Sequence, residues 1–224
     1  YGKFRNKNIT PLRKLNDSNF LLELYHGPTL AFKDIALQLL GNIFDYFLEK
    51  SKRRLTIIGA TSGDTGSAAI DAVKNNKFSN IFILHPHNRI SEFQRRQMTT
   101  VNTKNVFNIA VKGSFDDCQN IVKKMFVDGS LKKKINLGSI NSINWTRIMA
   151  QISYYIYAFN KVRDITGEKN VSFSVPTGNF GDAYAGFLAK EKLKIPINKI
   201  IVATNSNNIL DRFFRTGTYK KGNV

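Results

Sequence analysis

Residues 25–34 read Y-H-G-P-T-L-A-F-K-D and join a predicted strand to a predicted helix. The turn residues Gly27 and Pro28 end an apolar strand over 20–25. Thr29 can cap the helix that follows, because its hydroxyl group can accept a hydrogen bond from a backbone N–H group there. The segment therefore predicts a strand, a tight turn and a helix start in close succession.

Lys33 stands at this helix start, between Phe32 and Asp34. The apolar residues that follow have helical spacing and predict a core-facing side: Ile35, Leu37, Leu39, Leu40, Ile43, Phe44 and Phe47. Burial and the positive end of a helix both disfavour a charged lysine, so a neutral amine becomes accessible. A lysine needs a neutral amine to bond covalently to a carbonyl carbon. An ordinary surface pair of Lys33 and Asp34 is the alternative, and this segment alone leaves both open.

The composition is that of a folded protein, since 42% of the 224 residues are hydrophobic and 12% are aromatic. This length suits one large domain or two small lobes. Cys118 is the one cysteine of the chain, so an internal disulfide bond is impossible and we expect a reducing, cytoplasmic compartment. The sequence shows no apolar run long enough to span a bilayer and no charged-then-apolar leader, so we expect no membrane partner.

The formal net charge is +18, from 34 Lys and Arg residues against 16 Asp and Glu residues. Nucleic-acid binders usually gather basic residues on one face, often between aromatic residues. Here the basic clusters are short and scattered: 52–54, 95–96, 123–124, 132–134 and 220–221. The charge therefore favours small anionic ligands over nucleic acid. A monomer and a homodimer are both compatible with the sequence.

Strands and helices alternate along the chain. Strands are predicted over 55–58, 81–84, 106–111, 135–140, 171–175 and 200–203. Helices are predicted over 67–76, 92–100 and 145–165, from Ser114 to about Gly129, and after Asp182 to about Leu193. This order predicts an α/β fold with a mostly parallel sheet and helices on both faces. Ligands bind such folds beyond the carboxyl ends of the strands, and both glycine-rich loops of the chain lie there.

The two glycine-rich loops offer backbone N–H groups at helix starts. In 178–182, which reads G-N-F-G-D, the glycines allow close approach of an anion such as a phosphate. In 61–66, which reads T-S-G-D-T-G, hydroxyl and N–H groups suit the carboxylate of an amino acid. An ordinary strand-to-helix turn is the alternative for each loop. Together with the amine of Lys33, the two loops suggest pyridoxal phosphate and an amino-acid substrate.

Four segments, in this order along the chain, resemble the threonine synthases of bacteria and fungi: 26–34, 60–66, 141–144 and 176–182. These are pyridoxal-phosphate enzymes of the tryptophan-synthase-β fold group (fold type II). The resemblance covers almost the whole chain and implies the central part of longer family chains. It implies a two-lobed α/β fold with mostly parallel sheets, flanking helices and the cofactor between the lobes. Residues 30–139 would form the smaller lobe, and 1–29 with 140–224 an incomplete larger lobe.

The resemblance also implies the roles of individual residues. Lys33 would hold the cofactor covalently and move protons, and the cofactor phosphate would lie on Gly178, Asn179, Phe180 and Gly181, with Asp182 close by. The substrate would be bound by Thr61, Ser62, Gly63, Asp64, Thr65, Asn141, Ser142 and Asn144. Arg147 is the candidate cation for a substrate phosphate, with a solvated helix arginine as the alternative.

The implied reaction converts O-phospho-L-homoserine and water to L-threonine and phosphate. The alternatives are another enzyme of the fold group, such as a serine/threonine dehydratase, a non-catalytic ligand-binding relative, and a basic nucleic-acid-binding domain. A metal site is not expected, because His85 and His87 flank Pro86 in a predicted loop without a set of acidic or cysteine ligands. Cys118, on an apolar helix face, is expected in the core, as is the aromatic group of Tyr154, Tyr155, Tyr157 and Phe159.

Overall fold

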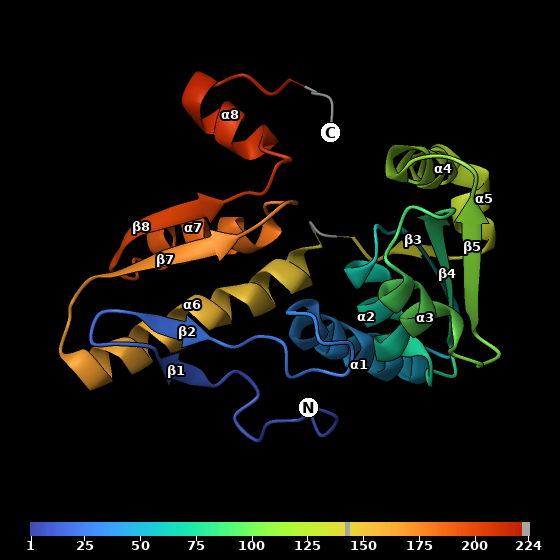
Figure 1. Cartoon of the computed structure of the whole chain (residues 1–224). Coiled ribbons are helices and arrows are strands. Elements are labelled where there is room, and N and C mark those ends of the chain that lie inside the picture. The colour runs from blue at the N-terminus through green and yellow to red at the C-terminus, as the bar shows by residue number, and fades with distance from the viewer. Residues whose placement is uncertain (142–143, 221–224) are drawn as a thin grey trace. The chain divides into compact units, whose positions relative to one another are not determined.

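A computed structural model of the chain describes residues 1–141 and 144–220 (Figure 1). The chain divides into two compact units. Unit 1 comprises Tyr1–Pro11 and Glu23–Asn144, and unit 2 comprises Leu12–Leu22 and Trp145–Val224. The predicted smaller lobe over 30–139 and the predicted larger lobe over 1–29 and 140–224 stay a prediction.

Unit 1 contains a four-stranded parallel sheet in the order β5-β4-β3-β6. Its strands are β3 (Leu55–Ala60), β4 (Ser79–Pro86), β5 (Val106–Val111) and β6 (Leu137–Ser139). Its helices are α1 (Lys33–Ser51), α2 (Asp64–Val73), α3 (Glu92–Thr99), α4 (Phe115–Val127) and α5 (Gly129–Lys134). The predicted α/β fold with a parallel sheet and flanking helices is confirmed.

Alternate residues of the central strands enter two separate cores, as the pleat of a strand requires. Ile57, Ile81 and Ile83 pack with apolar residues of α1, α2 and α3. Ile58 and Leu84 pack on the other face with residues of α4. Each fully buried aliphatic side chain contributes about 1.5–3 kcal/mol to folding. Helices therefore cover both faces of the sheet.

The strand order places a topological switch point between β3 and β6. From β3 the chain adds β4 and then β5 on one side, and it returns to add β6 on the other side. Ile58 of β3 lies opposite Ser139 of β6, so the loops that follow these strands start beside each other. Open parallel sheets bind ligands at such a point.

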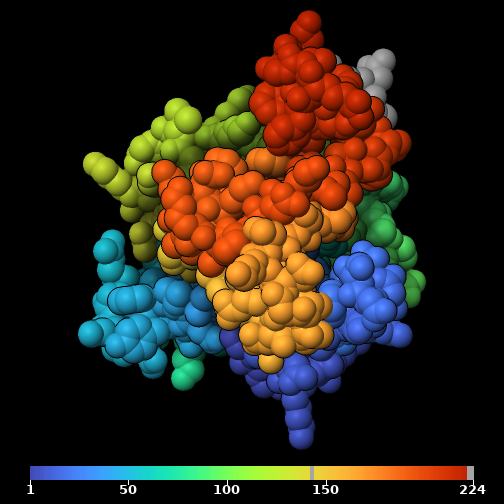
Figure 2. All heavy atoms as spheres, turned by 90° about the vertical axis from the view of Figure 1, so that its left-hand side faces the viewer, coloured from blue at the N-terminus to red at the C-terminus, as the bar shows by residue number. Residues whose placement is uncertain are grey.

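In its described residues, which end at 220, unit 2 contains two small sheets and three helices. The antiparallel pair β1 (Leu12–Lys14) and β2 (Phe20–Leu22) lies beside α6 (Trp145–Thr166) in two perpendicular views (Figure 1 and Figure 2). The other elements are β7 (Val171–Pro176), α7 (Gly181–Glu191), β8 (Ile197–Ala203) and α8 (Ile209–Thr216). β7 and β8 pair in parallel.

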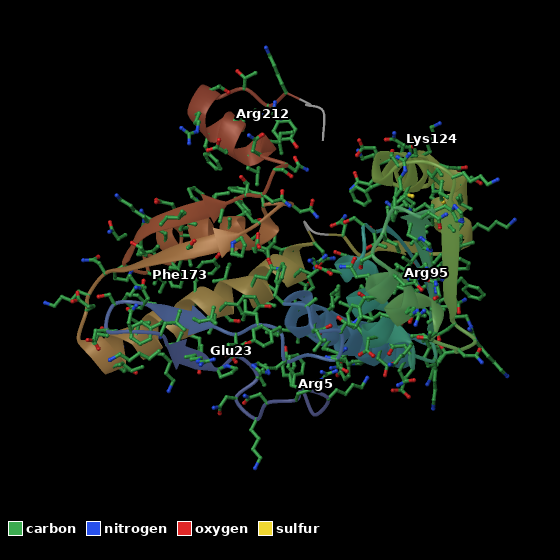
Figure 3. All side chains as sticks on the ribbon, viewed as in Figure 1. Arg5, Glu23, Arg95, Lys124, Phe173 and Arg212 are labelled. Atoms are coloured by element: carbon green, nitrogen blue, oxygen red, sulfur yellow. The ribbon has the colours of Figure 1, made fainter. Side chains whose placement is uncertain are left out.

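The packing of α6 on α7 depends on a glycine. A Cβ atom at Gly186 of α7 would lie 2.6 Å from the ring of Tyr155 on α6. The same ring meets Phe173 of β7, which Figure 3 labels, edge-on with the two ring centroids 4.9 Å apart. The predicted core position of Tyr155 is confirmed, since the residue is buried. Gly186 therefore lets the helices approach closely enough to bury an aromatic ring between them.

Unit 2 also exposes large apolar side chains on its surface. They include Tyr184, Phe187, Leu193, Ile201 and Phe214. Within residues 1–141 and 144–220, no helix has the length and apolar character needed to cross a membrane.

The predicted helix start at Lys33 is confirmed, but Thr29 does not cap the helix. The helix follows Phe32, and the hydroxyl of Thr29 instead donates to the carboxylate of Asp34 at 2.6 Å. The strand predicted over 20–25 ends at Leu22.

Other boundaries also differ from the prediction. Gly129 does not end α4, because α4 ends at Val127 and Asp128 caps a further helix, α5, by accepting two backbone N–H groups at 3.0 Å. The strand predicted over 135–140 is limited to Leu137–Ser139. α2 begins at Asp64 rather than Ser67. His85 lies in β4 and is buried, so its predicted loop position is wrong.

Candidate active site

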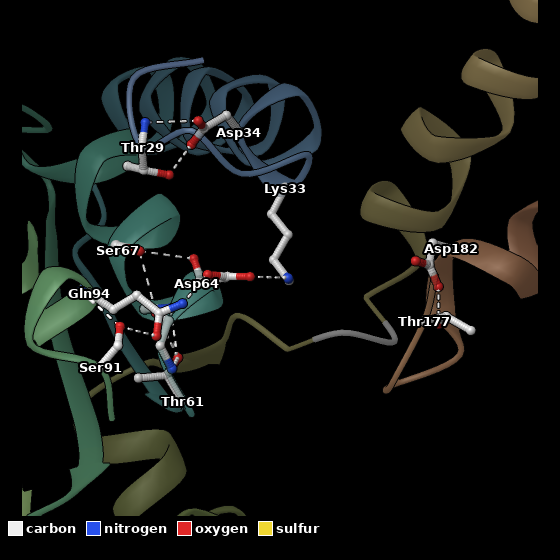
Figure 4. Close-up of polar contacts among 12 residues, drawn as sticks. Thr29, Lys33, Asp34, Thr61, Asp64, Ser67, Ser91, Gln94, Thr177 and Asp182 are labelled. Atoms are coloured by element: carbon white, nitrogen blue, oxygen red, sulfur yellow. Dashed lines mark hydrogen bonds and ion pairs between the residues drawn. The ribbon is translucent and has the colours of Figure 1, made fainter. Parts of the chain in front are cut away.

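Lys33 meets a carboxylate from another helix. Its Nζ donates a hydrogen bond to Oδ2 of Asp64 at 3.2 Å and lies 4.4 Å from the ring centroid of Phe32 (Figure 4). The side chain of Lys33 is 13% exposed, whereas that of Asp64 is 47% exposed. Lys33 and Asp64 are the first residues of α1 and α2. Nothing in the sequence around Lys33 indicated that the carboxylate of Asp64 would be its partner.

The turn before Lys33 is fixed by Asp34. This carboxylate is fully buried and accepts the N–H group of Thr29 at 2.8 Å as well as its hydroxyl group. Burial raises the pKa of Asp34, although the hydrogen bonds from Thr29 act in the opposite direction. A Cβ atom at Gly27 would lie 2.3 Å from the carboxylate, so only glycine fits there. The backbone that carries Lys33 is therefore held by a buried network.

The 61–66 loop is organised by the hydroxyl group of Thr61, which is 1% exposed. Its Oγ1 accepts the N–H groups of Gly63 at 3.0 Å and Gly66 at 2.9 Å. Gly63 has a φ of 141°, a backbone conformation that would be strained in any residue with a side chain. Ser62 is exposed and Thr65 is half-buried. Thr61 therefore satisfies N–H groups at the start of α2 that a ligand or a capping side chain would otherwise take.

The third predicted segment follows β6. Asn141 is exposed, and its carbonyl oxygen accepts the N–H group of Asn144 at 3.4 Å. Ser142 lies outside the described residues. Arg147, in the first turn of α6, is 1% exposed, and burial lowers its pKa to about 10. The alternative interpretation of Arg147 as a solvated helix arginine is therefore wrong.

The 178–182 loop, in unit 2, is organised by Thr177 and Asp182. The hydroxyl of Thr177 donates to Oδ1 of Asp182 and accepts the N–H group of Phe180 at 3.2 Å (Figure 4). The backbone carbonyl of Asp182 accepts a hydrogen bond from the hydroxyl of Tyr155 at 2.7 Å. Phe180 has a φ of 59° and directly precedes α7. The loop thus presents the positive end of α7.

The residues fit pyridoxal phosphate, which has an aldehyde and a phosphate group. The amine of Lys33 can bond to an aldehyde, and its partly buried position protects such a bond from bulk water. A helix start after a glycine-rich loop suits a phosphate. Among the described atoms, none lies within 4 Å of a Cβ built at Gly178, so a ligand could approach that backbone. In the described part of the chain, no group of three or more His, Cys, Asp or Glu residues could hold a metal ion.

A family model described as "Pyridoxal-phosphate dependent enzyme" matches residues 5–224. The chain belongs to this family. Pyridoxal phosphate, the cofactor predicted from the sequence, is therefore the cofactor of the family to which the chain belongs.

Curated members of the family are similar to nearly all of the chain. The threonine synthase of Eremothecium gossypii is 52% identical over 234 residues, which cover 99% of this chain and 45% of that protein. The threonine synthase of Pseudomonas aeruginosa is 53% identical over 221 residues, which cover 99% of this chain and 46% of that protein. The predicted resemblance is confirmed. The chain spans about half the length of these relatives.

Solved structures of family members agree with the fold. A structure of threonine synthase from Brucella melitensis with bound PLP has a TM-score of 0.87 and 48% identity, covering 100% of this chain and 48% of that one. The yeast threonine synthase structure has a TM-score of 0.87 and 47% identity, covering 100% of this chain and 46% of that one. The predicted fold type II is confirmed.

The described contacts join Lys33 to Asp64 and Thr61 to the backbone of its own loop. They also reveal residues that the sequence analysis missed. Gln94 contacts Asp64, and Thr177 and Tyr155 hold the 178–182 loop. The spacing of Ser91 and Gln94 matches a capping box and could have drawn attention to this helix start. Nothing in the sequence pointed from Tyr155 to Asp182.

Proposed function

We propose that this chain binds pyridoxal phosphate through Lys33 and supplies residues for the conversion of O-phospho-L-homoserine and water to L-threonine and phosphate. The observation that supports this most is the placement of Lys33, partly buried at the start of α1 and paired with Asp64, in a chain about half identical to threonine synthases. Because the chain spans about half of those proteins, the activity of the whole enzyme is part of the proposal.

Lys33 has two tasks in this proposal. Its amine would hold the cofactor at the aldehyde carbon, and as a free amine it would carry protons to and from the substrate carbons. The cofactor, when bound, withdraws electrons from the substrate. Asp64 keeps a carboxylate next to Lys33 Nζ and so defines where the amine lies. Removal of the Lys33 amine should therefore abolish turnover.

The two glycine-rich loops would bind the anionic groups. In 178–182, Gly178, Asn179, Phe180 and Gly181 would hold the cofactor phosphate near the start of α7, with Asp182 fixing the loop through Thr177. In 61–65, Thr61 fixes the backbone and Ser62 is exposed, so the hydroxyl groups of Ser62 and Thr65 and the backbone of Gly63 and Asp64 are the proposed contacts of the substrate carboxylate.

The substrate phosphate would need cationic and amide donors. Asn141, Ser142, Asn144 and Arg147 are the proposed residues for it. With a pKa of about 10, Arg147 is positively charged at neutral pH even though it is buried. A buried guanidinium binds a phosphate more strongly than an exposed one, because water competes less.

The remaining predictions belong to the same proposal. We infer a cytoplasmic enzyme that acts on a small molecule and does not bind nucleic acid, as a monomer or a homodimer. The single cysteine and the scattered basic residues support this inference.

The proposal is tested by incubating the chain with pyridoxal phosphate and O-phospho-L-homoserine and measuring phosphate and L-threonine. We expect equal amounts of both products, loss of both in Lys33→Ala, and retention in Lys74→Ala, where another partly buried, ion-paired lysine is removed. In a parallel incubation with added L-threonine, formation of a keto acid, without phosphate release from O-phospho-L-homoserine, would indicate a dehydratase instead. Cofactor binding without any product would support a ligand-binding relative and contradict the proposed reaction.

A further inference from the structure

The carboxylate of Asp64 is placed where it has several possible partners. As the first residue of α2 it lies near backbone N–H groups, and an aspartate at a helix start commonly accepts them. Its side chain is also 47% exposed, so water competes for its oxygens. A contact with Lys33 therefore requires something that directs this carboxylate away from its own helix.

The hydroxyl group of Thr61 binds backbone N–H groups that would otherwise compete with Lys33 for the carboxylate of Asp64. Its hydroxyl group accepts the N–H groups of Gly63 and Gly66 at the start of α2. The capping position of α2 is Gly63, which has no side chain to offer. The N–H groups that Asp64 would otherwise attract are thus already satisfied in part by Thr61.

Gln94 of α3 engages the remaining oxygen of Asp64 (Figure 4). Its Nε2 donates a hydrogen bond to Oδ1, while Oδ2 accepts the hydrogen bond from Lys33. With both oxygens bound to different helices, the carboxylate cannot rotate without losing a contact. The position of Lys33 Nζ therefore depends on Gln94 through Asp64.

The amide of Gln94 is itself oriented by Ser91. The hydroxyl of Ser91 donates to Oε1 of Gln94 at 2.9 Å, and its oxygen accepts the backbone N–H group of Gln94 at 3.3 Å. A carboxylate only accepts hydrogen bonds, so the amide nitrogen must face Asp64. Ser91 and Asp64 thus specify the same orientation of the amide. Ser91 also caps α3, on which Arg95 is visible in Figure 3.

Two further contacts fix α3 against the site. Met98 is fully buried, and a Cβ atom at Gly66 would lie 2.6 Å from its sulfur. Gln97 donates to the carbonyl oxygen of Thr29 at 3.0 Å, in the turn that precedes Lys33. Residues 94, 97 and 98 lie on one face of the helix. α3 therefore contacts both the lysine turn and the 61–66 loop.

We propose that Gln94 is a positioning residue, which holds Asp64 so that Asp64 holds the amine of Lys33. The importance of this positioning for catalysis rests on the proposed function of Lys33. The contact chain itself does not, because it is formed by residues of unit 1 without a ligand. If Gln94 had only a structural role, it would join α3 to α2, and its loss would not change the reactivity of the Lys33 amine.

The test measures how fast an amine-acetylating reagent modifies individual lysines of the cofactor-free chain at one fixed pH, by peptide mass spectrometry. Gln94→Met keeps the length of the side chain but removes the donor. We expect Lys33 to react about two- to tenfold faster in this variant, the range that corresponds to losing one hydrogen bond. Lys74, which is paired with Asp71, should react as in the wild type.

Gln38→Met is the matched control. Gln38 donates to Oδ2 of Asp71 at 2.9 Å, while Lys74 donates to Oδ1, so a second glutamine, aspartate and lysine have the same arrangement in unit 1. Gln38→Met should accelerate Lys74 and leave Lys33 unchanged. An equal effect of both variants on both lysines would indicate general loosening and overturn the proposal.

A double-mutant cycle with Asp64→Asn closes the test. Asp64→Asn should accelerate Lys33 on its own, and adding Gln94→Met should then have no further effect. Wild-type reactivity of Lys33 in Gln94→Met, or additive effects in the double variant, would contradict positioning through Asp64. Because no cofactor is present, these outcomes do not depend on whether Lys33 binds pyridoxal phosphate.

Discussion

Nζ of Lys33 lies 3.2 Å from Oδ2 of Asp64, although the two residues are 31 positions apart in the chain. Both residues begin helices, so the positive ends of α1 and α2 both act on this pair. The carboxylate is favoured by those ends, whereas the ammonium is not. Asp64 therefore offsets the unfavourable helix field at Lys33, and contacts with this carboxylate affect the lysine.

Thr61→Val should destabilise unit 1. Valine has nearly the same shape but cannot accept the N–H group of Gly63, whereas the N–H group of Gly66 keeps the carbonyl oxygen of Gly63 as an acceptor at 3.1 Å. Each buried donor left without a partner costs about 1–3 kcal/mol. Urea unfolding followed by circular dichroism measures the loss. Thr61→Ser, which keeps the hydroxyl group, is the control and should lose about 1 kcal/mol for the missing methyl group. Equal losses in the two variants would argue against the role of the hydroxyl group.

Gly63→Ala should both destabilise the chain and release Lys33. The φ of 141° strains any side chain, and the new Cβ atom would lie 2.1 Å from Oε1 of Gln94. We expect a loss of about 1–3 kcal/mol in the free energy of unfolding and faster acetylation of Lys33. Gly129→Ala is the control, because within the described residues a Cβ atom there meets nothing within 4 Å. If Lys33 in Gly63→Ala reacted at the wild-type rate, the position of the Lys33 amine would not depend on the 61–66 loop.

Asp34→Asn should change the dependence of stability on pH. Because burial raises the pKa of Asp34, the folded chain holds this proton more tightly than the unfolded chain does. The stability from this group is complete below the ordinary value of 3.8 and is lost as the pH rises through the raised pKa. Asparagine does not titrate, so the wild type should lose stability relative to Asp34→Asn over this rise.

The same position tests the hydrogen bonds of Asp34. Asp34→Ala removes both contacts with Thr29 and should cost about 1–3 kcal/mol, measured by urea unfolding at neutral pH. Asp34→Asn can keep both contacts and should lose less. A larger loss in the asparagine variant than in the alanine variant would show that the contacts matter little.

Tyr155→Phe should weaken the 178–182 loop, because the carbonyl oxygen of Asp182 loses its donor. The expected cost is about 1 kcal/mol, and the fluorescence of Trp145, the chain's one tryptophan, reports it from α6. Burial, with a smaller effect from Asp182, raises the pKa of Tyr155 above its ordinary value of 10.0. The stability difference between the wild type and Tyr155→Phe should therefore persist up to the ordinary tyrosine pKa of 10.0 and shrink as the pH rises through the raised pKa of Tyr155. A pH-independent difference would contradict this assignment.

The sequence predicted the elements whose signals are local. The start of α1 at Lys33 and the cap of α4 by Ser114 follow from nearby residues. The parallel sheet follows from the alternation of strands and helices along the chain. The end of α4 was wrong because Gly129 signals a helix end while Asp128 signals a helix start, and the second signal prevails. α5 contains a run of lysines without apolar periodicity, so the pattern that identifies helices was missing.

The contacts within the site were less predictable. The pairs of Lys33 with Asp64 and of Asp64 with Gln94 join residues about 30 positions apart, and only the folded sheet brings them together. The sequence predicted that Thr29 caps a helix. Instead, the buried carboxylate of Asp34 accepts hydrogen bonds from both the backbone N–H group and the hydroxyl group of Thr29. Where a side chain has two possible hydrogen-bond partners, the tertiary structure rather than the local sequence decides which partner it takes.

The attachment of pyridoxal phosphate to Lys33 is the central claim, and trapping the bound cofactor tests it most directly. The chain is incubated with pyridoxal phosphate, reduced with borohydride, digested and analysed by mass spectrometry, with Lys33→Ala in parallel. We predict one dominant modified peptide that contains Lys33, and a visible absorbance band that is absent from the variant. Modification spread over the exposed lysines, or unchanged in Lys33→Ala, would contradict the account.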